Sequence, residues 1–409
     1  MASIFRLMQR FLKQPPSTPR QFPATGFDVL ERDQLIEEET LPHYSPTQFF
    51  SVRIGEILNA KYQVVGKLGY GGNSTAWLCR DLSEHKYVAV KVCRRESEQV
   101  TREIQAYKHL NTLTSSHSGA LLIREMIDSF DISNAQGKYP CIVHKPLSMS
   151  LARLRSKCPN RRLPVNVLKP ALVHILLALD FLHSEAHIIH TDLQEGNIIL
   201  GIEDDSILEE YETNELRIPS PRKVDGDRII YKSRGLEISK DPGRPVITDF
   251  GEARIGQQTY DDDIQPFQYR APEVIMDAPW SYKVDIWNVG VMIWDLFEDK
   301  NMFNAKGPDG IPDSLYHMAY MTALLGPPPV DFLEHCRIER RQEYYDSKGE
   351  WKGLAEIPRT SLEESEENLD GKDKRQFLEF MRKMLKWRPE ERSSAKELLQ
   401  DTWLRSKTI

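Results

Sequence analysis

The hydrophobic pattern of this chain changes its period, and that change restricts the fold more than any other feature. Between residues 62 and 92, β-branched and aromatic residues alternate with turn residues, which predicts a run of antiparallel strands. From residue 97 the period becomes helical, and beyond residue 150 it stays mainly helical. A β-rich part followed by a helix-rich part predicts an α+β fold of two lobes with a cleft between them.

The composition fits a soluble protein in a reducing compartment. The chain has 409 residues, which is long for one hydrophobic core, and 28% of them are charged. Its net charge of -7 argues against a nucleic-acid-binding surface over the whole protein. Because the cysteines lack C-x-x-C spacing, we expect neither a disulfide framework nor a zinc site. The five cysteines are Cys79, Cys93, Cys141, Cys158 and Cys336.

No membrane-spanning helix is expected from the sequence. The longest apolar stretch, residues 165–183, is interrupted by Lys169, His174 and Asp180. An uninterrupted apolar run long enough to cross a bilayer is therefore missing from the sequence.

The N-terminal residues have the composition of a targeting segment. Residues 1–24 carry four cations and no acid, and their apolar residues fall on one helical face. This pattern is typical of a transit peptide, and a disordered tail is the alternative. An acidic linker, "ERDQLIEEET", follows. We expect residues 1–49 to be a partly disordered tail and linker.

The rest of the chain divides into two predicted lobes. Residues 50–147 form the β-rich lobe and a hinge, and residues 148–405 form the helical lobe. Residues 201–245 are polar and rich in turn residues, and they interrupt the helical pattern. We interpret them as an insertion within the second lobe.

A glycine turn lies early in the β-rich part. The stretch "LGYGGNSTAWL" places Gly69 and Gly71 in a G-x-G arrangement, with Ser74 where a third glycine often stands. Glycines there let a hairpin approach nucleotide phosphates without a Cβ in the way, although a plain hairpin turn gives the same pattern.

A lysine follows this turn at the distance of one strand. In "YVAVKV", Lys91 lies in an apolar strand, where an unpaired charge is costly. Glu103 lies in the next predicted helix at the edge of its apolar stripe and is the preferred partner. Glu96 lies on nearly the same face at the helix start and is the alternative.

The stretch "HIIHTDLQEGNIIL", residues 187–200, has the layout of a phosphoryl-transfer loop. Asp192 follows a histidine by two residues, and Asn197 follows Asp192 by five. The triplet Asp249-Phe250-Gly251 comes later, directly after a β-branched run, and an aspartate there can hold Mg²⁺.

The motifs occur in one fixed order, which chance does not readily produce. After the triplet come Ala271-Pro272-Glu273, then Asp285 in "KVDIWNVG", and finally Arg392. Any one motif is common by chance, whereas the ordered set predicts a protein kinase fold.

From about residue 50 to the C-terminus the chain resembles the eukaryotic protein kinases, in particular the SR-protein-specific kinase family and its fungal relatives. That family also reads H-T-D in its catalytic loop. Further similarities are "VRIGEILNAKYQVVGKLGYGGNSTAWL", "DDIQPFQYRAPEV" and the insertion before D-F-G. The resemblance implies a cytoplasmic and nuclear serine/threonine kinase that uses ATP and Mg²⁺ and phosphorylates Arg/Ser-rich proteins of the splicing-factor type. Mitochondrial targeting by the N-terminal segment is the alternative location.

The resemblance also assigns roles to individual residues. Asp192 would orient the substrate hydroxyl and accept its proton. Lys91, held by Glu103, would bind the α- and β-phosphates, and Gln194 takes the place of a lysine beside the transferred phosphate. The expected magnesium ligands are Asn197 and Asp249. The expected nucleotide-binding residues are Leu68, Gly69, Gly71, Ser74, Ala89 and Lys91, with Lys145 and Leu147 in the hinge.

Two residues depart from the usual kinase loop. Thr191 stands where most kinases have an arginine that clamps a phosphorylated activation segment, so we predict constitutive activity. Gln194 carries no charge where a lysine usually neutralises the γ-phosphoryl group. Loss of one such contact costs on the order of 2 to 4 kcal/mol. The alternative is therefore a pseudokinase, or an ATP-binding interaction scaffold, with weak or no catalysis.

The activation segment carries Asp261, Asp262 and Asp263 near the expected peptide site. Complementary charge would favour a basic substrate, and a solvated acidic loop is the alternative. The stretch "EDKNMFNAKGPDGIPDS" mixes both signs, which argues against strong docking at the acidic groove of the family. We expect a monomer with a protein substrate, and neither a direct nucleic-acid partner nor a membrane span.

Overall fold

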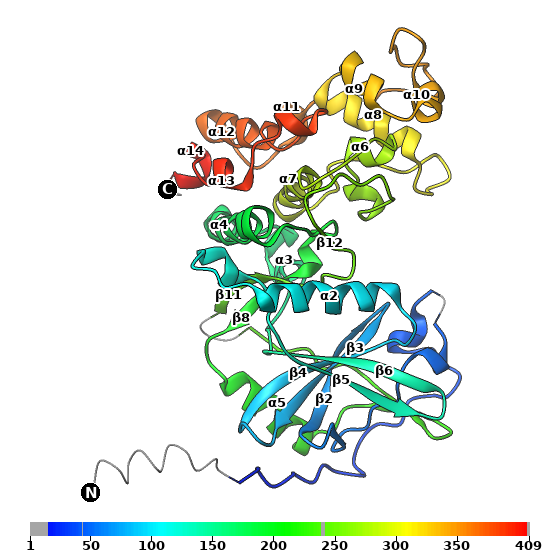
Figure 1. Cartoon of the computed structure of the whole chain (residues 1–409), viewed down its shortest axis with the longest axis vertical. Coiled ribbons are helices and arrows are strands. Elements are labelled where there is room, and N and C mark those ends of the chain that lie inside the picture. Colours follow the sequence, from blue (N-terminus) through cyan, green and yellow to red (C-terminus); the bar gives the residue numbers. More distant parts are fainter. Residues whose placement is uncertain (1–14, 43, 239–241, 407–409) are drawn as a thin grey trace, which may run out of the picture. The chain divides into compact units, whose positions relative to one another are not determined.

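The computed structural model describes residues 15–42, 44–238 and 242–406, and it divides into two compact units (Figure 1). Of the described residues, the first unit contains those up to Thr101, those from 125 to 148 and those from 201 to 243, and the second contains the others. Each unit therefore gathers segments that are far apart in sequence. Most of the predicted targeting segment, residues 1–14, lies outside the described residues.

A six-stranded antiparallel sheet forms the centre of the first unit, as the alternating pattern predicts. Its strand order is β1-β2-β3-β4-β6-β5. Each pairing between these strands is antiparallel. The strands are β1 Ile57–Leu58, β2 Tyr62–Gly71, β3 Ser74–Asp81, β4 Lys86–Cys93, β5 Met126–Asn134 and β6 Gly137–His144.

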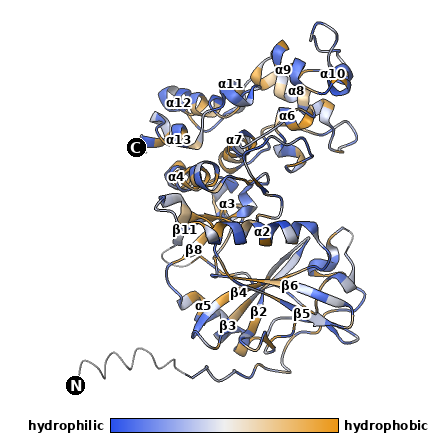
Figure 2. Cartoon of the chain, viewed as in Figure 1, coloured by the Kyte–Doolittle hydropathy of each residue, from blue (hydrophilic) through white to orange (hydrophobic). Residues whose placement is uncertain are grey.

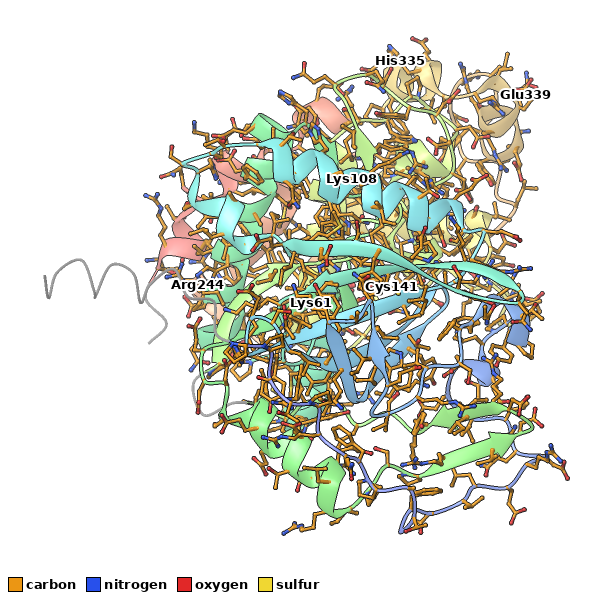
Figure 3. All side chains as sticks on the ribbon, turned by 60° about the horizontal axis from the view of Figure 1, so that its bottom comes forward. Lys61, Lys108, Cys141, Arg244, His335 and Glu339 are labelled. Carbon is orange, nitrogen blue, oxygen red and sulfur yellow. The ribbon has the colours of Figure 1, made fainter. Side chains whose placement is uncertain are left out.

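Alternation along β4 separates the two faces of the sheet. Val88, Val90 and Val92 are buried in one apolar core with Cys141 of β6, which Figure 3 labels. Lys91 points to the opposite face, because successive side chains of a strand alternate. Figure 2 shows the apolar residues of these strands in orange. The period-two pattern therefore places Lys91 outside the valine core.

The insertion packs against the same sheet. Its helix α5 (Ser206–Arg217) places Leu208 and Tyr211 in a second apolar core with residues of β2 and β3. A Cβ added to Gly66 would lie 2.6 Å from the Tyr211 hydroxyl oxygen, so glycine permits this close approach. The Tyr211 hydroxyl also donates to the carbonyl oxygen of Lys67 at 3.0 Å.

The structure shows which unit the insertion joins and which elements it forms. The sequence boundaries put residues 201–245 within the helical lobe, whereas the structure groups residues 201–243 with the first unit. The turn-rich stretch also folds regularly, since α5 is followed by the hairpin of β9 (Arg222–Asp225) and β10 (Arg228–Tyr231). The physical reason is the apolar face of α5, which is buried only by packing on the sheet.

The residues that precede the sheet belong to the first unit as well. Two short 3-10 helices, η1 (Glu37–Thr40) and η2 (Pro46–Gln48), lie in this segment. Val29 forms a parallel bridge with Arg222 of the insertion, and Val52 is buried in the core of the sheet. The predicted acidic linker is therefore an integral part of the packing of this unit.

Helices dominate the second unit. The unit boundary falls inside α2 (Glu98–Thr112), and every residue of α7 (Lys283–Glu298) from Val284 onward is buried. Four short strands form two ladders, β8 with β11 and β7 with β12. They are β7 Ile188–Ile189, β8 Ile198–Ile202, β11 Pro242–Ile247 and β12 Arg254–Ile255. The other α-helices are α3 Leu151–Lys157, α4 Val165–Phe181, α6 Pro272–Ile275, α8 Ser314–Leu325, α9 Val330–His335, α10 Ile338–Tyr344, α11 Leu362–Ser365, α12 Gly371–Arg382, α13 Ala395–Leu398 and α14 Thr402–Arg405.

One helical stretch of the described residues, Val165–Ala186, is long and apolar enough to cross a membrane. Of its most apolar window, 56% is buried inside the unit. Lys169 on this helix is 7% exposed and donates from Nζ to the Ser406 hydroxyl at 2.9 Å. These buried contacts identify the stretch as a helix of the protein core.

Candidate active site

The predicted glycine turn joins β2 and β3 in the first unit. Gly71 pairs with Ser74 at the tip, and Gly69 pairs with Ala76. A Cβ added to Gly69 or Gly71 would meet no atom within 4 Å. The packing of the chain therefore gives no reason for glycine at these positions, whereas the close approach of a phosphate group does.

The other residues predicted to bind the nucleotide lie on the same unit. Lys91 is half-buried on β4, and Ala89 of the same strand pairs with His144 at the end of β6. Nδ1 of the buried His144 lies 2.8 Å from the carbonyl oxygen of Glu125. The remaining three are Leu68, which is half-buried, Lys145, which is exposed, and Leu147, which is half-buried.

The two glutamates proposed as partners of Lys91 differ in environment. Glu103 lies within α2 and is 3% exposed. Glu96 is exposed and precedes α2, with a left-handed backbone of φ 55°. The environment of a helical, buried carboxylate suits the predicted role better, and the pairing of Glu103 with Lys91 stays a prediction.

The catalytic loop of the second unit holds both carboxylate oxygens of Asp192. Gln194 donates from Nε2 to Oδ1 at 3.0 Å, and Asn197 donates from Nδ2 to Oδ2 at 2.9 Å. Asn197 Nδ2 also donates to the Asp192 carbonyl oxygen at 2.8 Å. The sequence motif thus brings three of its predicted residues into direct contact, and the contacts orient the carboxylate.

The pKa of the Asp192 carboxyl is raised to about 6, mainly by burial and also by the negative charge of Asp249. Three contacts oppose this shift: the electrostatic interaction with His190 and the hydrogen bonds from Asn197 and Gln194 all lower the pKa of Asp192. A carboxyl group that titrates close to neutral pH is matched to accepting a proton from an alcohol in the reaction.

A buried aspartate anchors the start of this loop. Asp285 of α7 accepts the backbone N–H of His190 at 2.9 Å and that of Thr191 at 2.8 Å. His183 Nε2 lies 2.8 Å from the same carboxylate. Asp285 is fully buried, so these contacts satisfy its charge and fix the backbone directly before Asp192.

The D-F-G triplet is tied to the same loop through aromatic packing. Phe250 is fully buried, and its ring centroid lies 5.0 Å from that of His190 and 5.3 Å from that of Tyr107 on α2. Asp249 has a left-handed backbone, with φ of 64°, and accepts the Gly251 N–H at 3.4 Å. These contacts place Asp249 beside the catalytic loop.

The donor set at this site fits a magnesium ion that is shared with a nucleotide. Asn197 uses Nδ2 for both of its hydrogen bonds, which leaves its amide oxygen for a cation, and Asp249 supplies carboxylate oxygens. Hard oxygen donors suit Mg²⁺, which usually takes only one or two protein ligands beside phosphates. Within residues 15–42, 44–238 and 242–406, no group of three or more His, Cys, Asp or Glu residues forms a metal cluster.

Comparison with known proteins decides the family. The model of the protein kinase domain matches residues 62–219 and 227–404. The chain belongs to the protein kinase family. A serine/threonine protein kinase of Aspergillus fumigatus is 47% identical over 403 residues, which cover 98% of each chain.

More distant relatives place this kinase beside the SR-protein-specific kinases. The serine/threonine-protein kinase SRPK of Physarum polycephalum is 26% identical and covers 90% of this chain and 91% of its own. The mouse SRSF protein kinase 3 is 24% identical over 90% of each chain. A crystal structure of a kinase domain superposes with a TM-score of 0.67 over 88% of this chain and all of its own, at 21% identity. The predicted fold, the enzyme class and the resemblance to this family are confirmed: the chain is an SRPK-like serine/threonine protein kinase.

The kinase holds its activation segment with its own side chains. Arg254 pairs with Asp262, and Arg270 pairs with Asp263 at 2.6 Å. Tyr260 stacks on Trp280 with ring centroids 5.0 Å apart. Two of the three aspartates expected to attract a basic peptide are thus already paired within the segment, which weakens that expectation.

Several functional contacts of the kinase were missed at the level of sequence. Arg155 of α3 holds both carboxylate oxygens of Glu195 at 2.7 Å, directly beside Gln194. Glu273 and Arg392 were recognised as motif residues, and the structure joins them in a fully buried pair with both bonds at 2.6 Å. No local signal marks partners 119 positions apart.

Proposed function

We propose that this kinase transfers the γ-phosphate of Mg-ATP to serine in basic, Arg/Ser-rich proteins, and that it does so without phosphorylation of its activation segment. The hydrogen-bonded Asp192 is the observation that carries the catalytic part of the proposal. Similarity to the SRPK of Physarum polycephalum and to the mouse SRSF protein kinase 3 supports the substrate class.

Asp192 acts on the hydroxyl group of the substrate. Its carboxylate accepts the serine proton as the serine oxygen attacks the γ-phosphorus, and the bond to the bridging oxygen of ADP breaks. Gln194 and Asn197 keep the carboxylate in one orientation during this step. When bound, Mg²⁺ supplies positive charge that neutralises the phosphates.

Gln194 supports catalysis in a different way from the usual lysine. Its amide donates to the Asp192 carboxylate, which favours the ionised form that accepts the proton. The amide brings no positive charge to the transferring group, so we expect a slow turnover. Because the uncharged Gln194 predicts weak catalysis, an ATP-binding scaffold is the second candidate function.

Three sets of contacts support activity without phosphorylation. Asp262 and Asp263 already supply negative charge to Arg254 and Arg270, which is the role that a phosphate plays in an arginine-clamped segment. Gln265 donates from Nε2 to the Val284 carbonyl oxygen at 3.1 Å, and its Oε1 accepts the N–H of the residue before Pro272 at 2.8 Å. Gln265 therefore connects the segment to α7 and to the residue that precedes α6.

The decisive experiment measures transfer of labelled γ-phosphate to an Arg/Ser-repeat peptide and to a Lys/Ser-repeat peptide of equal charge. Wild-type protein treated with phosphatase should phosphorylate the Arg/Ser peptide faster than the Lys/Ser peptide. Asp192→Ala should abolish transfer, and Glu339→Ala, at an exposed position of α10, should leave it intact.

Three outcomes would contradict parts of the proposal separately. Activity lost after phosphatase treatment contradicts phosphorylation-independent activity, and equal rates on both peptides contradict the substrate class. If wild-type protein transfers no phosphate although ATP raises its melting temperature, the scaffold function replaces catalysis, especially if Gln194→Lys restores transfer.

A further inference from the structure

Three consecutive glutamates of η1 contact two parts of the first unit, the sheet and the insertion. Glu38 pairs with Lys67 of β2, and Glu39 accepts from Lys223 Nζ with both carboxylate oxygens at 3.0 Å. Glu37 accepts the hydroxyl proton of Ser233. The N-terminal segment, the insertion and the sheet are thus joined by one cluster, which we call the acidic clamp: Glu37, Glu38, Glu39, Lys67, Lys223 and Ser233.

The clamp lies directly beside the glycine turn in sequence. Lys67 is fully buried and precedes Leu68 and Gly69, the first residues expected to bind the nucleotide. Besides Glu38, its Nζ donates to the Tyr231 carbonyl oxygen at 3.2 Å and lies 3.5 Å from Glu37. A buried ammonium group depends strongly on such partners, so their loss would displace the strand that carries the turn.

The backbone of Glu37 is held in a conformation that a free segment would avoid. Its φ is 54°, in the left-handed region that residues other than glycine seldom adopt. Such a residue persists where its surroundings hold it in place. The contacts of Glu37 with Ser233 and Lys67 supply that restraint, so η1 should relax when they are broken.

Ser233 is the member of the acidic clamp whose hydroxyl group a kinase can phosphorylate. It is half-buried, and residues 232–238 form neither helix nor strand, so no regular hydrogen-bonded element holds the segment. Its neighbours are Lys232 and Arg234, and Ser233-Arg234 is the one Ser-Arg dipeptide in the entire sequence. The two basic neighbours fit the basic character of the substrate class proposed above.

We propose that Ser233 is a phosphorylation site, modified by a second copy of this kinase, and that its modification opens the acidic clamp. The step forms a bond between Ser233 Oγ and the γ-phosphorus of ATP, breaks the bond to the bridging oxygen of ADP, and passes the hydroxyl proton to Asp192 of the acting copy. The inference rests on the proposed function, because it uses the same activity and the same preference for serine in a basic sequence.

The Ser233 hydroxyl donates a hydrogen bond to the Glu37 carboxylate, whereas a phosphate at the same position would repel that carboxylate. The phosphate carries nearly two negative charges at neutral pH and would stand against the Glu37 carboxylate. Lys67 and Lys223 already form ion pairs with Glu38 and Glu39. The phosphate would therefore add negative charge to a mostly buried cluster. The least costly response is release of η1 from the sheet.

The modification is tested by incubating unphosphorylated full-length protein with Mg-ATP and mapping phosphate by mass spectrometry. We expect phosphate on the Ser233 peptide of wild-type protein, and none on that peptide in Asp192→Ala protein incubated alone. Added wild-type kinase should phosphorylate Ser233 of the Asp192→Ala protein, since the reaction occurs between copies.

The same samples separate failure of the inference from failure of the proposed function. Transfer to an Arg/Ser peptide with no phosphate at Ser233 overturns only the inference. If phosphate is transferred neither to the Arg/Ser peptide nor to Ser233, the proposed function fails, and the inference that rests on it fails as well.

The opening of the clamp is tested with protein that carries phosphoserine incorporated at position 233. Hydrogen exchange of residues 36–40 should become about tenfold faster, and the KM for ATP should rise several-fold. The matched control carries phosphoserine at Ser156, which is exposed and lies between Arg155 and Lys157. Exchange at residues 36–40 that is unchanged or slower, or that is equally fast in the Ser156 control, would overturn the clamp.

Discussion

Thr191 donates a hydrogen bond from Oγ1 to the carbonyl oxygen of Glu252 at 2.7 Å. Thr191 is fully buried, with a left-handed φ of 65°, and Glu252 directly follows the D-F-G triplet. The bond therefore joins the catalytic loop to the start of the activation segment. It explains how a loop without the usual arginine can still organise that segment.

Thr191→Val should weaken this connection, because valine keeps the shape of threonine and removes the hydroxyl group. Arg254 also donates to the Glu252 carbonyl, so we expect a loss of only about 1 kcal/mol in the free energy of unfolding. The turnover number should fall as well. Thr191→Ser keeps the hydroxyl and serves as the control, and equal turnover of the Val and Ser variants would contradict the proposed connection.

The rate should fall on the acid side as Asp192 becomes protonated. Its raised pKa of about 6 predicts that kcat/KM decreases tenfold per pH unit well below pH 6, because only the carboxylate accepts the proton. A pH profile with an Arg/Ser peptide measures this value. A profile that stays flat down to pH 5 would contradict Asp192 as the proton acceptor.

The same raised pKa predicts how stability depends on pH. A carboxyl group whose pKa is higher in the folded protein stabilises the fold below its unfolded value of 3.8, and this contribution is lost as the pH rises through about 6. Asp192→Asn should therefore raise the melting temperature more at pH 8 than at pH 5. Thermal denaturation at both pH values checks this sign.

Gln194→Lys should raise kcat, because an ammonium group would neutralise charge on the transferred phosphate. A contact of this kind is worth on the order of 2 to 4 kcal/mol in comparable sites, although part of that gain is lost with the bond to Asp192. Gln194→Ala should lower kcat and is the paired variant. If both variants have wild-type rates, Gln194 has no part in the reaction.

Arg392→Met should destabilise the second unit strongly. The substitution leaves the buried Glu273 carboxylate without its bidentate partner, which typically costs about 3 to 5 kcal/mol. The double variant Arg392→Met/Glu273→Gln should recover part of the loss. Chemical denaturation of wild type, Arg392→Met, Glu273→Gln and the double variant measures the coupling, and additive losses would contradict a direct pair.

His317→Leu should maintain or increase stability. Burial lowers the pKa of His317 on α8 to about 3, so the ring is neutral at pH 7. Within the described residues neither ring nitrogen has a hydrogen-bond partner, and the ring packs against Phe303 and Phe267. Leucine removes two unsatisfied polar atoms, and a gain of up to about 2 kcal/mol is expected from thermal denaturation. A large loss would show that the ring nitrogens are satisfied by water.

The chemistry-bearing residues could be named from the sequence because they stand at short, fixed spacings. Asp192, Gln194 and Asn197 lie within six consecutive residues of one loop, so their side chains meet without any long-range contact. The strands could be predicted for a similar reason, since β4 shows its period of two directly in its valines. Both are properties of neighbouring residues.

Other features depended on contacts that no local pattern reveals. The sequence suggested Asp262 and Asp263 as a surface for a basic peptide, yet each pairs with an arginine of its own segment. The acidic linker was interpreted as part of a tail, whereas Glu38 balances the buried Lys67. A charged residue looks the same in a sequence whether its partner is water or a distant side chain.

By itself the sequence determined the family, the change from a β-rich to a helix-rich part, and the motif of the catalytic loop, because spacing and periodicity are local. The tertiary structure decided which charges are buried together, where the insertion packs, and how Thr191 reaches Glu252. The physical reason is that burial and ion pairing depend on residues brought together over long separations, and their energies exist only once the chain has folded.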